Sequence, residues 1–215
     1  MTLALDTCLS ACSAALVRDG EVLSRLVEPM SRGHQERLAD LVAETLAEAG
    51  LSFGDLTRIA VTVGPGSFTG LRVGLAFAKG LGAALDLPVI GVGTLEAMGA
   101  SLATASGLLV AVLEAKRGQV YFQAFEQGQM LTAPAGLDIN AAGALLVDLS
   151  RTGTVTLIGS GTDHLCALVP RAEIVRSEFI DPVHVARLAA MRSPTPPRPL
   201  YLRAPDAKRP GGLTP

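Results

Sequence analysis

The sequence predicts an α/β protein of two lobes, each built from a mixed sheet with helices. Three observations support this fold class. A series of strand-like segments opens the chain and gives way to alternating helices and strands, and the same order restarts in the second half. The chain has 215 residues, 49% of them hydrophobic, which is enough to form the cores of two small lobes. We therefore expect an N-terminal lobe at residues 1–105 and a C-terminal lobe at residues 106–215.

The first half begins with a predicted antiparallel meander of three strands. Its segments read TLALDT, SAALV and EVLSRLV, and Asp19–Gly20 forms a hairpin turn between the last two. Further strands are expected at RIAVTV and LPVIGVG. Helices are expected at HQERLADLVAETLAEAG, which ends at Gly50, from Thr69 to Asp86, and at TLEAMGASLAT with Thr94 as its N-cap.

The second half repeats this order without repeating the sequence. An apolar strand, GLLVAVLEA, carries Glu114 near its end, as the first strand of the chain ends in Asp6. The strand QVYFQAF and a turn at EQGQML complete a second meander. We then expect a helix at INAAGALLVDL, a strand at GTVTLIG and a short helix at GTDHLCALV. The last helix, DPVHVARLAAM, has Asp181 as N-cap and Pro182 in its first turn.

Composition and charge argue against several classes of protein. The net charge of −2 gives no overall attraction to nucleic acid or to anionic membranes. The N-terminus lacks a basic region, and the longest uncharged stretch, residues 97–113, is shorter than the roughly 20 apolar residues of a membrane span. Cys8, Cys12 and Cys166 form no disulfide framework and are best explained as small buried hydrophobes. We expect a soluble cytoplasmic protein without contact to a membrane.

The stretch VGPGSFTGLRVG, from Val63 to Gly74, joins a strand to a helix as phosphate-binding loops do. It matches neither of the two common phosphate motifs, because Lys79 lies too far along and the glycine spacing differs from G-x-G-x-x-G. We assign it a weak, vestigial nucleotide or phosphate site. The residues of this predicted site are Asp6, Thr7, Gly64, Gly66 and Ser67.

The helix after this loop carries a stripe of small residues at every fourth position. Each interior glycine costs a helix about 1 kcal/mol relative to alanine, so something must pack closely on the stripe. Two explanations remain open: the stripe faces its own sheet, or it faces a partner together with the apolar face of the preceding helix. The residues of the predicted partner interface are Leu38, Leu41, Val42, Gly70, Gly74, Ala78 and Gly82.

The histidines and hydroxyls suggest neither a metal site nor a catalytic centre. His34, His164 and His184 each have leucine at i+4, and the sequence contains no H-x-x-x-H or C-x-x-C pair. Ser67 has no identifiable base, so no catalytic residue is assigned. Lys116 and Arg117 are explained as solvated turn residues. The proline-rich C-terminus is expected to be an extended basic tail, with Leu200, Tyr201 and Leu202 as its apolar anchor. Its cations at residues 203–209 could contact an RNA backbone, but a short tail of this kind is usually solvated.

Several stretches together resemble one protein family. The segments LALDT, CSAAL, GPGSFTGLRVG, LPVIGVGTLEAM, AKRGQVYFQAF and PLYLRAP occur in the order of the TsaB family, also called YeaZ, and cover most of the chain. The resemblance implies an actin-like (ASKHA, RNase H-like) two-lobed fold. It also implies a non-catalytic partner of TsaD that acts with TsaE to place threonylcarbamoyl on the adenosine next to the anticodon of tRNAs reading codons that start with A.

The resemblance implies further that the two helices at His34–Ala49 and Thr69–Asp86 contact TsaD, or a second copy of the chain when TsaD is absent. The tRNA would be reached only indirectly, through the complex. Three departures bear on nucleotide binding: GSGTDH is a thin counterpart of the superfamily's adenosine motif, and Glu114 and Gln119 replace an aspartate and a glutamate expected in the family. We therefore expect no cofactor in the isolated chain, with ATP or ADP confined to an interface shared in the complex.

Two other functions compete with this interpretation. One is a small ATP-dependent kinase or ATPase of the actin-like class, with Asp6 near the nucleotide phosphates. The other is a peptidase, as an older name of TsaD and its relatives, glycoprotease, suggests. The peptidase ranks last because neither a nucleophile–base pair nor the H-x-x-x-H pair through which TsaD binds its metal is present in the sequence.

Overall fold

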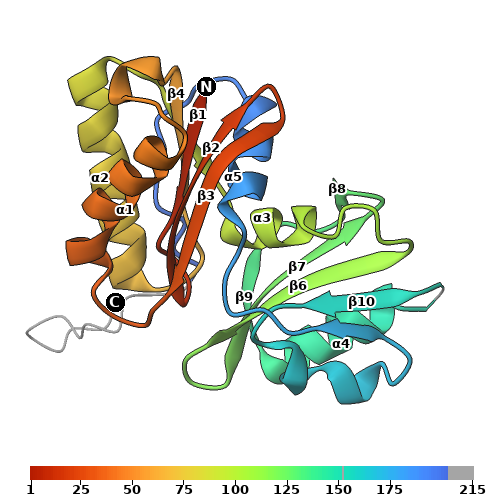
Figure 1. Ribbon diagram of the computed structural model, residues 1–215. Helices are drawn as coiled ribbons and strands as arrows, with labels where there is room; N and C mark the ends of the chain where they lie inside the picture. Colours follow the sequence, from red (N-terminus) through yellow and green to blue (C-terminus); the bar gives the residue numbers. More distant parts are fainter. Residues whose placement is uncertain (152, 203–215) are drawn as a thin grey trace, which may run out of the picture.

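The computed structural model describes residues 1–151 and 153–202, and it confirms the two-lobed α/β fold class (Figure 1). The elements of the first half are β1 (Thr2–Asp6), β2 (Ala11–Arg18), β3 (Glu21–Pro29), α1 (His34–Glu48), β4 (Arg58–Thr62), α2 (Phe68–Leu85), β5 (Val89–Val92) and α3 (Thr94–Ala100). Those of the second half are β6 (Leu108–Ala115), β7 (Gln119–Glu126), β8 (Gln129–Met130), β9 (Ala135–Asp138), α4 (Ile139–Leu149), β10 (Val155–Ile158), β11 (Glu173–Val175) and α5 (Pro182–Ala190).

The two sheets have closely related strand orders. The first runs β3-β2-β1-β4-β5, with an antiparallel meander on one side and strands parallel to β1 on the other. The second runs β11-β10-β6-β7-β8, in which β6 takes the place of β1 and β10 the place of β4. The restart of the pattern in the sequence therefore corresponds to a repeated topology.

Both faces of the first sheet are covered, which explains why β1 and β4 are almost entirely apolar. Helices α1 and α2 lie side by side on one face, and α5 covers the other (Figure 1). Leu3, Leu5 and Ile59 point toward α1 and α2, whereas Ala4 and Ala60 pack toward α5. Helix α4 packs on the outer face of the second sheet, and α3 lies between the lobes (Figure 1).

The last described residues belong with the first lobe, contrary to the expected C-terminal lobe at 106–215. Val183, Val185, Ala186 and Ala189 of α5 are buried against the first sheet and α3. The physical reason is the apolar face of that sheet, which α5 covers after the chain returns from the second lobe. The C-terminal segment then continues along β5, where Pro197 packs on Gly91.

One local prediction is wrong, and two short strands were not predicted. The segment GTDHLCALV forms two single 3₁₀ turns, Thr162–His164 and Cys166–Leu168, instead of a short α-helix. Strands β9 and β11 were not expected, because their short sequences AGLD and EIV carry little strand signal. They form because the neighbouring strands β7 and β10 offer unpaired backbone groups.

Candidate functional site

The glycine loop after β4 packs against the segment that follows β1. The backbone N–H of Ser67 donates to the carbonyl of Cys8 at 2.7 Å, and the hydroxyl of Thr7 donates to the carbonyl of Gly70 at 2.7 Å. A Cβ on Gly70 would lie 1.9 Å from the Thr7 carbonyl oxygen, and one on Gly66 would lie 2.3 Å from that of Cys8. Glycine is required here because two backbone segments touch.

This packing bears directly on the predicted phosphate site. Asp6, Thr7, Gly64, Gly66 and Ser67 come together at the carboxyl ends of β1 and β4, which are adjacent parallel strands of the first sheet. The space between them is filled by the chain's own atoms, and the Ser67 N–H is already hydrogen-bonded. A phosphate would have to displace these contacts.

Asp6 is fully buried at the end of β1. Its Oδ1 accepts hydrogen bonds from the Thr62 hydroxyl at 2.6 Å and the Cys8 N–H at 3.0 Å, whereas no partner is found for Oδ2 within the described part of the chain. Burial raises the pKa of Asp6 to about 6, and the hydrogen bond from Thr62 only partly opposes this. Asp6 is therefore poorly suited to hold a phosphate.

The raised pKa makes the stability of the fold depend on pH. The folded protein binds the Asp6 proton more tightly than the unfolded chain does, so protonated Asp6 stabilises the fold. This contribution is complete below pH 4 and is lost as pH rises through 6. Asp6→Asn removes the titration. We expect the free energy of unfolding of the variant, relative to the native protein, to rise by up to about 3 kcal/mol between pH 4 and pH 7.

Urea denaturation at several pH values measures this difference. Asp55→Asn is the matched control with the opposite sign, because hydrogen bonds from Ser52 lower the pKa of the exposed Asp55. The native protein should gain stability over the Asp55 variant as pH rises. A difference between native protein and Asp6→Asn that stays constant from pH 4 to pH 7 would contradict the assigned burial of Asp6.

The glycine stripe of α2 faces the interior of the first lobe, so the predicted partner interface is wrong at all seven of its residues. A Cβ on Gly74 would lie 2.5 Å from the Thr7 hydroxyl, and one on Gly82 would lie 2.4 Å from a methyl group of Val89. Ala78 is fully buried. Leu38, Leu41 and Val42 of α1 are also buried, in the same core cluster as Leu71 and Leu75. The alternative that the stripe packs on its own sheet is the one the structure supports.

The outward sides of the same two helices carry a second set of small residues, which the sequence analysis missed. We call it the small-residue face, and it consists of Ala39, Ala43 and Ala47 on α1 and Ala76, Gly80 and Ala83 on α2. All six are exposed, and a Cβ on Gly80 would meet nothing within 4 Å. The spacing of three or four residues was visible in the sequence. Because small residues occur on both sides of α2, the spacing alone does not show which set faces outward.

A hydrophobic outward side is unusual for a surface helix. Helix α2 has 18 residues and only two charged ones, Arg72 and Lys79, so it is apolar or small almost all round. A helix of this kind is normally buried, because a surface helix presents charged residues to solvent. The small-residue face is therefore a candidate surface for close packing of another helix.

The second lobe uses its glycine loop in the same way as the first. After β10, Gly159 and Gly161 pack on the end of β6: a Cβ on Gly159 would lie 2.2 Å from the carbonyl oxygen of Val112, which accepts a hydrogen bond from the Gly161 N–H at 3.0 Å. Glu114 is exposed beside this loop, and its N–H donates to the Ser160 hydroxyl. Both strand ends that would flank a nucleotide are thus closed by the chain's own backbone.

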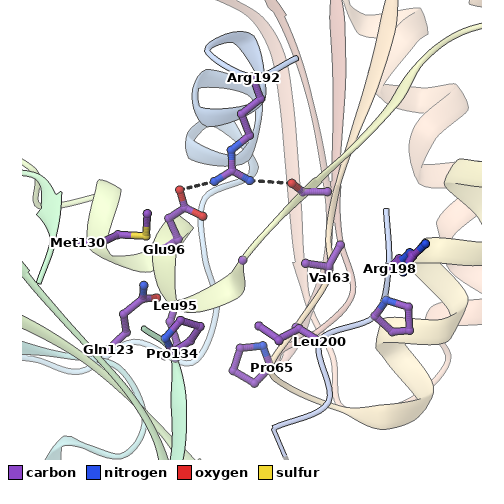
Figure 2. Close-up of a pocket in the computed structure, with 14 residues that line it drawn as sticks. Val63, Pro65, Leu95, Glu96, Gln123, Met130, Pro134, Arg192, Arg198 and Leu200 are labelled. Carbon is purple, nitrogen blue, oxygen red and sulfur yellow. Dashed lines mark hydrogen bonds and ion pairs between the residues drawn. The ribbon is translucent and has the colours of Figure 1, made fainter. Parts of the chain in front are cut away.

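A pocket of about 350 Å³ lies between the lobes (Figure 2). Arg192, just after α5, pairs with Glu96 of α3 and donates to the carbonyl of Gly91 at 2.7 Å. Gln123 of β7 lines the opposite side, and its amide donates to the carbonyl of Thr132. These polar groups are engaged with each other or with the backbone, each set within its own lobe.

The C-terminal segment is fixed over the glycine loop. The Leu200 N–H donates to the carbonyl of Val63 at 2.7 Å, and Leu200 and Leu202 are partly buried, as expected of an apolar anchor. Tyr201 differs from this expectation, because it is 46% exposed and its ring lies against that of Phe68. The predicted solvated cations of residues 203–209 lie outside the described residues.

The remaining candidate residues have simple environments. Cys8 and Cys12 are buried core residues, as expected, and burial raises the pKa of both thiols. Cys166 is partly exposed, and Lys116 and Arg117 lie at the exposed turn between β6 and β7. Within residues 1–151 and 153–202, no cluster of three or more metal-binding side chains is present. In the same ranges no helix is both long enough and apolar enough to cross a membrane.

Comparisons with known sequences identify a family. The model of the TsaD family, tRNA N6-adenosine threonylcarbamoyltransferase, matches residues 26–152, more than half of the chain. An uncharacterized protein of Mycobacterium tuberculosis is 37% identical over 211 residues, which are 96% of this chain and 93% of that protein. The tRNA threonylcarbamoyladenosine biosynthesis protein TsaB of Escherichia coli is 38% identical over 129 residues, 59% of this chain and 55% of that protein.

Solved structures agree with these matches. A Pseudomonas aeruginosa protein described as similar to the peptidase YeaZ has a TM-score of 0.80 and 27% identity, covering 94% of this chain and 99% of that one. A ROK hexokinase of Thermus thermophilus, at 17% identity and a TM-score of 0.52 over 88% of this chain and 97% of that one, shares the actin-like fold alone. From the family model, the sequence relatives and the YeaZ-like structure together, we conclude that the chain belongs to the TsaB/YeaZ family.

Proposed function

We propose that this chain takes part in the biosynthesis of threonylcarbamoyladenosine in tRNA, as a non-catalytic subunit that pairs with TsaD. TsaE completes the set of proteins that place threonylcarbamoyl on the adenosine next to the anticodon of tRNAs reading codons that start with A. The names of the relatives support the pathway. The observation that carries the subunit role is the small-residue face on α1 and α2.

The small-residue face suits a helical partner for two reasons. Gly80 lies inside a helix, where it costs about 1 kcal/mol relative to alanine, and a Cβ there would meet nothing within the chain. Alanine and glycine at this spacing let a second helix approach closely, and the scarcity of charge on α2 lowers the cost of removing water. We propose TsaD as the occupant, and a second copy of this chain when TsaD is absent.

The packing of both glycine loops supports the proposal that this chain is a non-catalytic partner of TsaD. In both lobes, the loop that would hold a phosphate is packed on the end of the neighbouring strand by contacts that require glycine. The kinase or ATPase alternative needs this space for nucleotide. We therefore favour the subunit role over it, and we place any ATP or ADP at an interface shared with the partner.

Reconstitution tests the proposed function. TsaD and TsaE from the same organism, unmodified tRNA and threonylcarbamoyl-adenylate should yield modified tRNA only when this chain is added, and this chain without TsaD should yield none. A calorimetric titration of the isolated chain with ATP should give a dissociation constant of about 1 mM or weaker, corresponding to about −4 kcal/mol.

Two results would contradict the proposal. Turnover by this chain without TsaD would show that it is itself an enzyme. A dissociation constant for ATP near 1 μM, about −8 kcal/mol, would favour the kinase or ATPase instead.

A further inference from the structure

A cluster of two aromatic rings and one arginine lies at the start of α2, outside the small-residue face. We call it the aromatic platform, and it consists of Phe68, Arg72 and Tyr201. Phe68 is 53% exposed and Tyr201 is 46% exposed, with their ring centroids 5.5 Å apart. Large exposed aromatic side chains cost free energy in water, so a pair of them at one place indicates a contact surface.

The arginine of the platform is held in a defined orientation. The Arg72 guanidinium lies 3.8 Å from the centroid of the Phe68 ring, and its Nε donates to the Tyr201 hydroxyl at 3.2 Å. No carboxylate pairs with Arg72 among the residues that the structure describes, and no further hydrogen bond engages Nη1 or Nη2 there. Both groups are thus positioned to donate to a phosphate.

Anchoring of the C-terminal segment does not account for the exposed rings. The segment is already held by the hydrogen bond from Leu200 to Val63 and by the partly buried Leu200 and Leu202. Tyr201 adds to this anchoring through its contact with the Phe68 ring and through the hydrogen bond that its hydroxyl accepts from Arg72. About half of each aromatic side chain nevertheless stays exposed in the described part of the chain.

The two elements that carry the platform bear cations and no acidic residue, although the complete chain has a net charge of −2. The described residues from Arg192 to Leu202 include Arg192 and Arg198 and no acidic residue. Helix α2 adds Arg72 and Lys79 and contains no acidic residue. A local excess of cations beside exposed aromatic rings is typical of surfaces that bind single-stranded nucleic acid.

We propose that the aromatic platform binds single-stranded RNA directly, as an unpaired loop of the tRNA that the complex modifies. Bases stack on Phe68 and Tyr201, and the Arg72 guanidinium donates to a backbone phosphate. This inference rests on the proposed function for the identity of the RNA. It goes beyond the expected indirect contact, because it gives this chain an RNA-binding surface of its own.

Binding of unmodified tRNA to the complex of this chain with TsaD tests the platform. Phe68→Leu with Tyr201→Leu keeps apolar bulk but removes both ring faces, and the dissociation constant for tRNA should rise about tenfold or more. Arg72→Gln should weaken binding less, and should lower the slope of log affinity against log salt by about one. The matched control is Arg18→Gln, an exposed cation at the β2–β3 turn, which should leave the affinity within twofold.

Parallel sedimentation of the same variants with TsaD separates RNA binding from protein binding. Weaker tRNA binding with unchanged TsaD binding supports the platform. Unchanged tRNA affinity overturns it, and so does a loss of TsaD binding, which would assign these residues to the protein interface. Tyr201→Leu alone is the second variant if the double one fails to fold, because Tyr201 lies after α5 and outside every described helix and strand.

A probe without TsaD keeps this inference distinguishable from the proposed function. A labelled single-stranded RNA oligonucleotide is cross-linked by ultraviolet light to the isolated full-length chain, and the modified peptides are identified. Cross-links at Phe68 or Tyr201 would support the platform even if reconstitution with TsaD failed. Cross-links confined to other peptides would overturn it even if reconstitution succeeded.

Discussion

Gly70→Ala is expected to destabilise the folded chain by about 3 kcal/mol or more, although it adds a single methyl group. The added Cβ would lie 1.9 Å from the carbonyl oxygen of Thr7, a backbone atom that cannot move without disturbing β1. Overpacking of a tight core typically costs 1–3 kcal/mol, and backbone contacts of this kind lie at the upper end. Thermal and urea unfolding of the purified variant measure the loss.

The same substitution on the outward side of α2 is the matched control. Gly80→Ala places its methyl group in open space, so we expect it to stabilise the chain by about 1 kcal/mol through helix propensity alone. The same glycine-to-alanine change should therefore lower the free energy of unfolding at residue 70 and raise it at residue 80, because the two residues lie on opposite sides of α2. Equal effects of the two substitutions would refute the assignment of Gly70 to the interior and Gly80 to the surface.

Gly80→Leu is expected to weaken pairing with TsaD by at least tenfold while leaving the isolated chain folded and slightly more stable. Leucine is a better helix former than glycine, so the substitution should stabilise the folded state of the isolated chain. Its side chain would stand on the small-residue face where the partner's backbone should approach, and overpacking there should weaken binding by at least tenfold. Sedimentation velocity of the variant with TsaD and calorimetric titration give the change in affinity.

Ala144→Leu controls for added bulk. Ala144 is exposed on α4 of the second lobe, away from the small-residue face, so its replacement should leave TsaD affinity within twofold. Self-association of the isolated chain should likewise be weakened by Gly80→Leu and left unchanged by Ala144→Leu. If Gly80→Leu bound TsaD as tightly as the native chain does, the small-residue face would not be the partner surface.

Much of the fold was accessible from sequence because short-range patterns determine it. The meander at the start of each lobe follows from alternating apolar segments and the Asp19–Gly20 turn, and α5 begins at the expected Asp181 and Pro182. The position of α5 was not accessible. Its amphipathic pattern predicts a covered face, but which sheet lies under that face depends on the return of the chain from the second lobe.

The two sides of α2 show most clearly where sequence reasoning reached its limit. Gly70, Gly74, Ala78 and Gly82 lie inside, while Ala76 and Gly80 lie outside, and both sets are small residues spaced by four. Hydrophobic periodicity separates apolar from polar sides, and α2 has no polar side. Long-range contacts identify the inner stripe, such as that of Gly70 with Thr7, which follows from the pairing of β1 with β4.

Asp6 illustrates the same limit for the candidate site. Its place at the end of β1 could be predicted from the apolar run that precedes it, whereas its position beside the glycine loop follows from the pairing of β1 with β4 in the sheet. Its burial could not, because distant segments cover the end of β1. The N–H of Ser10, for example, donates to the carbonyl of Glu178 from the far end of the chain. A strand-end acid that suggests phosphate binding therefore has a raised pKa in an enclosed environment.

Hydrogen–deuterium exchange of this chain, alone and in complex with TsaD, tests the subunit role most directly, because it reports on every element without a mutation. The isolated chain should be measured at a concentration where it is monomeric. The account predicts that TsaD slows exchange mainly in α1 and α2, with little change at the glycine loops after β4 and β10 or around the pocket between the lobes. Protection confined to those loops or to the second lobe, with α1 and α2 unchanged, would contradict it.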